Sequence, residues 1–202
     1  MIEIKNLCKA FDKHKIFSDF SLSIKTGELV VLCGESGSGK TTLLNIIGAL
    51  EKYDKGDVLV DGIDLNNQRN HRSYFSDKVG FLFQNFVLIE DKTVRKNLEL
   101  IRKTNSSGVS IDEALEHVGL ADKIDSKVYT LSGGEQQRVA LARLMIKKCD
   151  VILADEPTGS LDTKNAERVL SILEELNRNG KTVILVTHDE EIKKRGWRVV
   201  EL

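Results

Sequence analysis

Residues 34–41 read Gly-Glu-Ser-Gly-Ser-Gly-Lys-Thr, and the rest of the chain can be placed around them. The stretch fits the pattern G-x-x-x-x-G-K-[ST] of phosphate-binding loops. The apolar run Leu29–Leu32 before it predicts a buried strand, and residues 41–47 after it predict the first turns of a helix. A strand, a glycine-rich loop and a helix therefore follow one another, which indicates an α/β domain with a phosphate site.

This loop offers several kinds of group to a phosphate chain. Glycines let the backbone approach an anion closely, and the start of a helix presents unpaired N–H groups and a partial positive charge. Lys40 adds a mobile ammonium, and the Thr41 hydroxyl can complete the shell of Mg²⁺, which prefers few protein ligands and phosphate oxygens. The alternative is a Gly/Ser-rich turn that binds nothing. The full match between a strand and a helix favours the phosphate site.

Composition and charge exclude several classes of protein. At 202 residues, the chain is one large domain or one domain with an inserted lobe. Lys and Arg number 30 against 31 Asp and Glu, so no overall basic field favours nucleic acid. The three cysteines lack the spacing of metal ligands and fit a reducing cytosol. No apolar run reaches the roughly 18 residues of a membrane span, so we expect a soluble chain that meets membranes only through a partner.

Strands and a hairpin are predicted in the first third of the chain. Residues 2–7 and 20–24 alternate apolar and polar side chains, as half-buried strands do. Phe11 lies between them in a polar segment. It is either an aromatic side chain at the edge of the core or a ring that stacks on a nucleobase. Val58–Val60, followed by Asp61-Gly62, predicts a hairpin.

The middle of the chain is predicted to change from strands to helices. Residues 66–77 are polar and show no clear period, and residues 79–83 then return to a strand pattern that ends at Gln84. An amide there can act as a neutral ligand of a metal or water, but by itself it is more often a surface side chain. From about 85 to 130 the pattern favours helices and loops, with a capping box at residues 110–113. We interpret this stretch as a helical lobe inserted into the α/β domain.

Two later segments carry candidate functional groups. Ser132-Gly133-Gly134 opens an apolar helix and is a second potential anion site, although a plain helix start is the commoner meaning of Ser-Gly-Gly. The run Val151–Ala154 predicts a buried strand that ends at Asp155 and Glu156. Open α/β sheets bind ligands at the ends of their strands. Asp155 is thus a candidate Mg²⁺ ligand, and Glu156 a candidate to polarise a water for in-line attack on the terminal phosphate.

A further strand and helix complete the predicted α/β domain. Asp162 is expected to cap a helix that Gly180 ends. Residues 183–187 predict another buried strand, with His188 at its end. A lone His is usually structural, but one at a strand end beside the other candidates could contact the terminal phosphate or the attacking water.

Taken in order along the chain, these motifs resemble the nucleotide-binding domain of an ATP-binding cassette (ABC) transporter. A phosphate loop alone also fits kinases, GTPases and other ATPases. The resemblance covers nearly the whole chain, and the motifs specific to the family are Gln84, residues 131–135 (LSGGE), residues 152–158 (ILADEPT), residues 160–162 (SLD) and His188. Proline, which members often carry before LSGGE and before the Asp-Glu strand, is absent from both places.

The resemblance implies a single ABC ATPase domain over residues 1–202. Its fold class would be α/β: a P-loop NTPase core with a mostly parallel sheet, an N-terminal antiparallel β subdomain and an inserted helical subdomain. Residues 1–84 and 131–202 would form the core with the antiparallel subdomain, and residues 85–130 the helical subdomain.

The resemblance also implies a role for each candidate residue, with ATP and Mg²⁺ as cofactors. Phe11 would stack on adenine, Glu156 would be the general base and His188 the switch at the γ-phosphate. Asp162 would make a contact across a subunit interface. The metal would be held by Thr41, Gln84 and Asp155. The residues implied to bind the nucleotide are Phe11, Gly34, Ser36, Gly37, Ser38, Gly39, Lys40, Thr41, Thr42, Gln84, Ser132, Gly133 and Gly134.

A second copy and a membrane protein are the implied partners. The family joins the phosphate loop of one subunit to the Ser-Gly-Gly of another, so a head-to-tail homodimer, or a heterodimer with a similar chain, would hold two ATP molecules. The chain would be cytoplasmic and peripheral at the inner face of the cell membrane, where it powers a separate permease. Gln84 would link the metal site to the helical lobe, which is the expected permease contact.

Two functions agree with this resemblance. Residues 42–48 and 79–86 resemble the branch of lipoprotein-releasing, macrolide-exporting and bacteriocin-type export systems, which suggests a peptide, lipopeptide or hydrophobic drug that is exported or extracted from the membrane. The alternative is a non-transport ABC ATPase that regulates a membrane complex, for example in the control of a cell-wall hydrolase.

Overall fold

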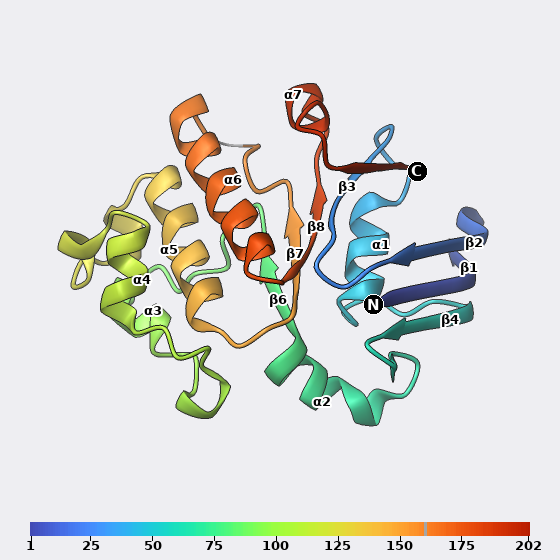
Figure 1. Ribbon diagram of the computed structural model, residues 1–202, viewed down its shortest axis with the longest axis horizontal. Helices are drawn as coiled ribbons and strands as arrows, with labels where there is room; N and C mark the ends of the chain where they lie inside the picture. The colour runs from blue at the N-terminus through green and yellow to red at the C-terminus, as the bar shows by residue number, and fades with distance from the viewer. Residues whose placement is uncertain (160) are drawn as a thin grey trace.

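The computed structural model describes residues 1–159 and 161–202, and it contains two sheets. The smaller sheet is antiparallel and has the strand order β2-β1-β4-β5 (Figure 1). Its strands are β1 (Ile2–Phe11), β2 (His14–Ile24), β4 (Lys55–Val60) and β5 (Ile63–Asp64). The hairpin predicted at Asp61-Gly62 is confirmed, because β4 and β5 pair antiparallel on either side of it.

The larger sheet is parallel throughout and has the order β6-β7-β8-β3-β9. Its strands are β6 (Val79–Leu82), β7 (Val151–Asp155), β8 (Thr182–Val186), β3 (Leu29–Cys33) and β9 (Arg198–Glu201). Apart from Thr182 and the half-buried Asp155 at the end of β7, the three central strands are apolar and buried on both faces, as parallel strands between helices require. The predicted α/β fold class with a parallel core and an antiparallel subdomain is therefore confirmed.

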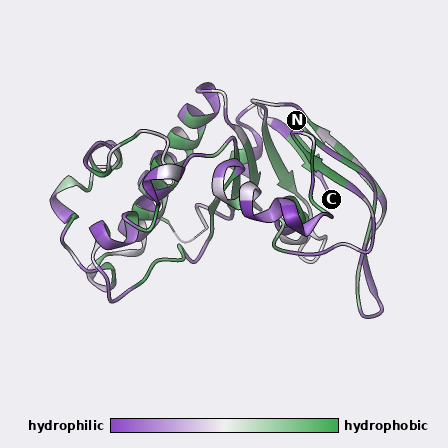
Figure 2. Cartoon of the chain, turned by 90° about the horizontal axis from the view of Figure 1, so that it is seen from below, coloured by the Kyte–Doolittle hydropathy of each residue, from purple (hydrophilic) through white to green (hydrophobic). Residues whose placement is uncertain are grey.

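Helix α1 (Lys40–Ile47) lies between the two sheets (Figure 1). Its apolar side chains Leu43, Leu44, Ile46 and Ile47 are buried in one cluster with residues of both sheets. In Figure 2, the central strands are coloured as hydrophobic, whereas the outer strands and the helices carry hydrophilic stretches. Because α1 packs on both sheets, the loop before it is held rigidly at their junction.

A second apolar cluster covers the opposite face of the parallel sheet. It includes α5 (Gly133–Ile146) and α6 (Thr163–Arg178), and it extends into α3 (Val94–Leu98) and α4 (Ile111–His117). Figure 1 shows α3, α4 and α5 side by side at one end of the molecule. The predicted capping box at residues 110–113 is confirmed. The boundaries of a helical subdomain at residues 85 and 130 stay a prediction.

The structure corrects two sequence-based expectations. Strands β1 and β2 extend well beyond residues 2–7 and 20–24, so Phe11 is the last residue of β1 and does not lie between strands. The register of this pair shifts at several points, and Asn6 and Asp19 have positive φ. Such bulges break the period of two, which is why the outer halves of the strands carry no alternating pattern.

Residues 66–77 hold helical turns that no sequence period predicted. The turns cover residues 68–70, α2 (His71–Ser73) and residues 74–78. Tyr74 is fully buried there, and its hydroxyl donates a hydrogen bond of 2.6 Å to the Ile47 carbonyl at the end of α1. Each turn is too short to show a helical repeat, so tertiary contacts fix this segment.

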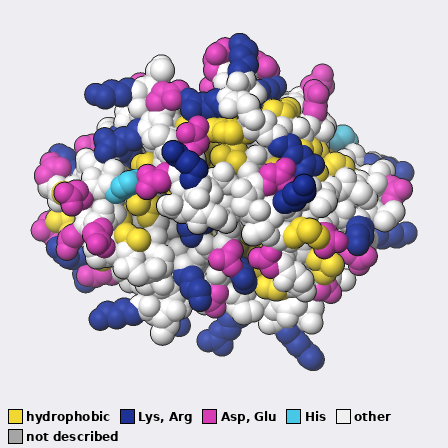
Figure 3. Space-filling view, viewed as in Figure 1, with side chains coloured by type: hydrophobic (Ala, Val, Ile, Leu, Met, Phe, Trp, Pro, Cys, Tyr) yellow, Lys and Arg dark blue, Asp and Glu magenta, His cyan; other side chains and the backbone are white. Residues whose placement is uncertain are grey.

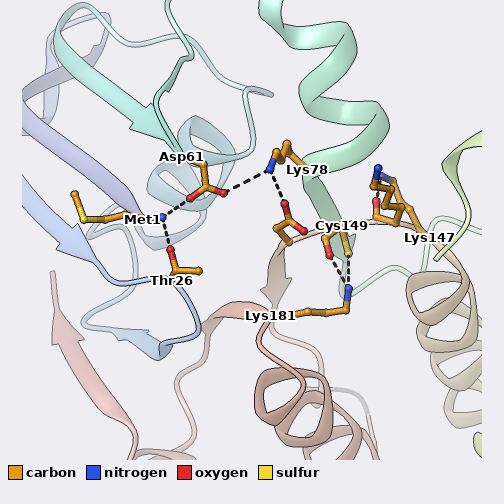
Figure 4. Close-up of polar contacts among 9 residues, drawn as sticks. Met1, Thr26, Asp61, Lys78, Lys147, Cys149 and Lys181 are labelled. Atoms are coloured by element: carbon orange, nitrogen blue, oxygen red, sulfur yellow. Dashed lines mark hydrogen bonds and ion pairs between the residues drawn. The ribbon is translucent and has the colours of Figure 1, made fainter. Parts of the chain in front are cut away.

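Charged side chains link the two sheets at one edge (Figure 4). The ammonium of Met1 donates to Thr26 Oγ1 at 2.6 Å and pairs with Asp61. Lys78 Nζ lies 3.8 Å from Asp61 Oδ2 and 2.6 Å from Asp150 Oδ2, so it joins the turn after β4 to the segment before β7. The Asp150 hydrogen bond is the main reason that the pKa of Lys78 is raised.

The surface mixes charges of both signs. On the face seen in Figure 3, Lys and Arg side chains alternate with Asp and Glu, and small apolar patches lie between them. This agrees with the formal net charge of −1. Within the part of the chain that the structure describes, no helix has the length and apolarity that crossing a bilayer requires.

Candidate functional site

The predicted phosphate loop joins the end of β3 to the start of α1. Gly37 and Gly39 have φ values of 85° and 99°, which L side chains rarely adopt. A Cβ on Gly39 would collide with Ile16 and would lie 2.8 Å from Phe17 Cζ, both on β2. The antiparallel sheet therefore presses against the loop so closely that glycine is required at this position.

Lys40 is held inside the loop. Its ammonium donates to the carbonyls of Gly34 at 3.0 Å and Glu35 at 2.7 Å, so the loop wraps around a positive charge. Ser38 Oγ is buried and has no hydrogen-bond partner among the described residues. A buried hydroxyl without a partner is costly unless a ligand satisfies it. The loop is thus built to receive an anion.

Thr41 and Asp155 bring two side-chain oxygen atoms together from α1 and β7. Thr41 Oγ1 donates to Asp155 Oδ1 at 3.3 Å. Burial is the largest cause that raises the pKa of Asp155, and the charge of Glu156 adds to it, while the Thr41 hydrogen bond and Lys40 act in the opposite direction. A half-buried carboxylate beside a hydroxyl and a phosphate loop fits Mg²⁺, which takes few protein ligands there.

Asp155→Asn is expected to stabilise the nucleotide-free protein. An acid whose pKa rises on folding costs the folded state free energy wherever it is ionised, and the amide removes that charge but keeps an acceptor for Thr41. Because the site is only partly buried, we expect at most about 1 kcal/mol, which corresponds to a rise in Tm of roughly 2–4 °C. Differential scanning calorimetry near pH 7 measures it.

Asp162→Asn is the matched control for this measurement. Hydrogen bonds from the backbone and side chain of Asn165 lower the pKa of Asp162, so its charge favours folding and its removal should not raise Tm. An unchanged or lower Tm for Asp155→Asn would contradict the argument that this carboxylate is destabilising without a cation.

Glu156 and His188 meet at the ends of β7 and β8. His188 Nδ1 lies 2.8 Å from Glu156 Oε1, and the second carboxylate oxygen, Oε2, is buried without a hydrogen-bond partner among the described residues. The Glu156 side chain is 17% exposed, whereas that of His188 is 76% exposed. Glu156 also has a φ of 45°, a sparsely populated conformation that clusters at functional sites. This leaves one desolvated oxygen free to accept a proton.

These groups line one hollow of about 570 Å³. Phe11, which is 44% exposed, lies on its wall with the phosphate loop, Glu156 and His188. The predicted residues that the structure places around the hollow are Phe11, Gly34, Ser36, Gly37, Gly39, Lys40, Thr41, Thr42, Glu156 and His188. The hollow therefore offers an aromatic ring, a cationic loop and an acid–imidazole pair to one ligand.

His14 also lines the hollow, and the sequence motifs do not predict it as a site residue. It pairs with Phe11 across the tight turn between β1 and β2. The signal that could have found it is the short polar turn Asp12-Lys13, which sets the residues on either side of it opposite each other.

Gln84 is exposed just after β6 and does not line the hollow. A Cβ on Gly159 would lie 3.6 Å from Gln84 Nε2, so the amide points toward the segment that follows Glu156. Arg143 of α5 fixes the residues that follow Gln84, because its guanidinium donates to the carbonyls of Phe86 at 2.9 Å and Val87 at 2.6 Å. The segment after Gln84 is thus tied to the helical end of the molecule.

Ser132, Gly133 and Gly134 lie at the start of α5 and do not line the hollow. Ser132 caps the helix in a capping box with Glu135, and both Ser132 and Gly133 are exposed. Within one chain, this predicted anion site and the phosphate loop are thus not brought together. Asp162 is exposed as the N-cap of α6, and Ser160, part of the quoted SLD motif, lies outside the described residues.

Several curated proteins with similar sequences are named as ATP-binding proteins. The macrolide export ATP-binding/permease protein MacB of Campylobacter jejuni is 42% identical over all of this chain, which covers 33% of MacB. The uncharacterized ABC transporter ATP-binding protein YvrO of Bacillus subtilis is 39% identical, with 99% of this chain and 92% of YvrO covered. The methionine import ATP-binding protein MetN of Clostridium acetobutylicum is 43% identical over 96% of this chain and 63% of MetN. The chain thus spans about a third of the length of the MacB relatives it matches.

Solved structures give the same fold. A dimeric structure of a post-hydrolysis state of the ATP-binding cassette MJ0796, bound to ADP and Pi, superposes with a TM-score of 0.87 at 37% identity, covering 100% of this chain and 94% of the other. The profile of the family described as ABC transporter matches residues 17–159. Together with relatives of about 40% identity along the whole chain, this match shows that the chain belongs to the ABC transporter family, as one of its ATP-binding cassettes.

Proposed function

We propose that the chain binds ATP with Mg²⁺ in the hollow around residues 34–41 and hydrolyses it to power a membrane permease. The observation that carries the proposal is the buried Oε2 of Glu156 beside His188, which has no hydrogen-bond partner among residues 1–159 and 161–202 and lies on the wall with the phosphate loop. The family and the ADP- and Pi-bound state of MJ0796 support hydrolysis as the reaction.

In this proposal each group at or beside the hollow has one task. Phe11 stacks on the base, the loop amides and Lys40 bind the phosphates, and Thr41 with Asp155 would hold Mg²⁺. When bound, Mg²⁺ would neutralise charge on the phosphate oxygens. Glu156 accepts the proton of the attacking water, because its Oε2 is desolvated and no hydrogen bond from the described part of the chain uses it. His188 orients that carboxylate through Oε1 and faces the terminal phosphate.

A second copy would complete the site. Ser132 and Gly133 present an exposed helix start that a phosphate held by a partner could reach. The dimeric structures of MJ0796 support this pairing. We therefore propose a head-to-tail homodimer with two ATP molecules in its interface.

The permease would bind at the junction of the parallel sheet and the proposed helical unit, residues 85–130. An apolar groove of about 220 Å³ lies there, lined by Phe81, Phe83, Val87, Ile101 and Leu144 together with two basic residues. The segment after Gln84 forms part of this wall, so a shift of the permease could reach the nucleotide site through it. This would place the chain at the cytoplasmic face of the membrane.

A protein named for export and a protein named for import are both similar to this chain, so the direction of transport is a separate proposal. MacB, which carries a permease in the same polypeptide, matches along the full chain, and we propose outward movement or membrane extraction of a peptide, lipopeptide or hydrophobic drug.

Phosphate release and photo-crosslinking test the proposed function. Purified chain should release phosphate from ATP only with Mg²⁺, and Lys40→Met should abolish the release. A photo-reactive side chain at Val87 should crosslink to an integral membrane protein in native membranes, whereas one at Val199, which is also exposed, should not. Hydrolysis without Mg²⁺, or equal crosslinking from both positions, would refute these assignments.

A further inference from the structure

We propose that Lys9 and Glu51 form a positioning pair that orients the ring of Phe11 for nucleobase stacking. Lys9 Nζ lies 4.3 Å from the centroid of the Phe11 ring, and it forms an ion pair of 2.6 Å with Glu51 Oε1. Neither Lys9 nor Glu51 lines the hollow. The inference rests on the proposed stacking role of Phe11 and adds the groups that fix this ring.

The burial of Lys9 is unusual for a lysine. Its side chain is 8% exposed, and lysine is almost never buried unless it is paired. Its charge is balanced by Glu51, whose side chain keeps 34% exposure and therefore stays solvated. A paired ammonium held under an aromatic face attracts the ring electrostatically, and the attraction strengthens when the cation is desolvated.

Glu51 connects this contact to the phosphate loop. It follows α1, the helix that begins at Lys40, and the backbone N–H of Glu51 donates to the Asn45 carbonyl of that helix at 3.2 Å. Close by, the Ala10 N–H donates to Asp54 Oδ2 at 2.8 Å and the Asp54 N–H to the Cys8 carbonyl at 2.9 Å. The end of β1 is thus fastened to the segment after α1 on both sides of Lys9.

The ring has one face available for a base. The ammonium of Lys9 covers one face of Phe11, and 44% of the residue is exposed toward solvent and the hollow. A ring fixed before the ligand arrives loses less freedom on binding than a mobile one. The pair therefore strengthens binding of the nucleoside part and leaves binding of the phosphates unchanged.

A double-mutant cycle on the full chain tests the pair. Titration calorimetry with ADP and Mg²⁺ avoids hydrolysis during the measurement. Lys9→Met keeps the aliphatic stem but removes the charge, and it should raise the Kd for ADP about threefold to tenfold. In a Phe11→Ala background, the same change should have no further effect, because the ring through which Lys9 acts is gone. Lys9→Arg keeps a cation over the ring and should restore most of the affinity.

Two further variants serve as a matched control and as a second test of the pair. Lys5→Met makes the same change on an exposed position of β1 and should bind ADP as the wild type does. Glu51→Gln leaves Lys9 intact but releases its ammonium, so it should raise the Kd in the same direction even if Lys9→Met folds poorly.

The outcomes distinguish failure of the proposed base site from failure of the positioning pair. If Phe11→Ala binds ADP like the wild type, the proposed base site itself is wrong. If Phe11→Ala weakens binding but Lys9→Met and Glu51→Gln do not, only the positioning pair is refuted. An equal effect of Lys9→Met with and without the Phe11 ring would also overturn the pair, since that result indicates a structural role elsewhere.

Discussion

Glu156→Gln is expected to slow ATP hydrolysis about a hundredfold to ten-thousandfold while ATP still binds. Gln keeps the shape of the side chain and a polar atom for His188 Nδ1. It replaces the buried Oε2, which has no partner among the described residues, by a group that cannot accept a proton. The loss should therefore fall on the chemical step. Single-turnover phosphate release and a separate measurement of the Kd for ATP distinguish the two.

The same variant should also trap the assembled form. If hydrolysis dissolves the proposed dimer, uncleaved ATP should hold Glu156→Gln as a dimer that light scattering detects. Glu191→Gln is the control, because this carboxylate is 80% exposed and pairs with Lys194 at the surface. Hydrolysis above about a tenth of the wild-type rate would exclude Glu156 as the principal base, because a general base contributes at least about a hundredfold.

The parallel core could be predicted because its strands are unusually simple. The runs Leu29–Leu32, Val151–Ala154 and Val183–Val186 are continuously apolar, which is typical of strands covered on both faces. Each matches a strand of the structure to within one residue. Since parallel strands end at one edge of the sheet, the candidates that follow them had to come close together.

The wall of the hollow that Phe11 and His14 form could not be predicted in the same way. Phe11 and His14 owe their positions to the length of β1 and β2, and bulges hide that length from a pattern of alternation. The contact of Lys9 with Glu51 joins residues 42 positions apart. It depends on how β1 pairs with β4, which no local pattern specifies.

The two predicted anion sites lie apart within one chain, and this separation bears on the proposed dimer. The phosphate loop and Ser132-Gly133-Gly134 each appear as a helix start that suits an anion, yet only the first lines the hollow. Under the proposed function, one chain thus carries two half-sites that it cannot join by itself. The resemblance to the family, and no property of the isolated fold, predicts that they meet in a dimer.

A mixture of two inactive variants should therefore recover activity. Lys40→Met damages the phosphate loop, and Gly133→Asp places a carboxylate where the partner's phosphate would lie. If each site takes one element from each protomer, a mixed dimer has one doubly damaged site and one intact site. Random pairing at equal concentrations makes half of the dimers mixed, so roughly a quarter of all sites are intact and about that share of wild-type hydrolysis should return.

Gly133 is the position of choice because the change should not disturb the fold. It is exposed in the first turn of α5, where an acidic side chain is favourable, and among the described residues a Cβ there would meet only Phe86 Cζ at 3.9 Å. At Gly134 a Cβ would lie 3.0 Å from Asn165 Nδ2, so a substitution there would confuse misfolding with loss of function. Gly133→Ala mixed with Lys40→Met is the control for size without charge. Hydrolysis by Gly133→Asp alone at the wild-type rate, or no recovery in the mixture although mixed dimers form, would show that the two half-sites do not meet.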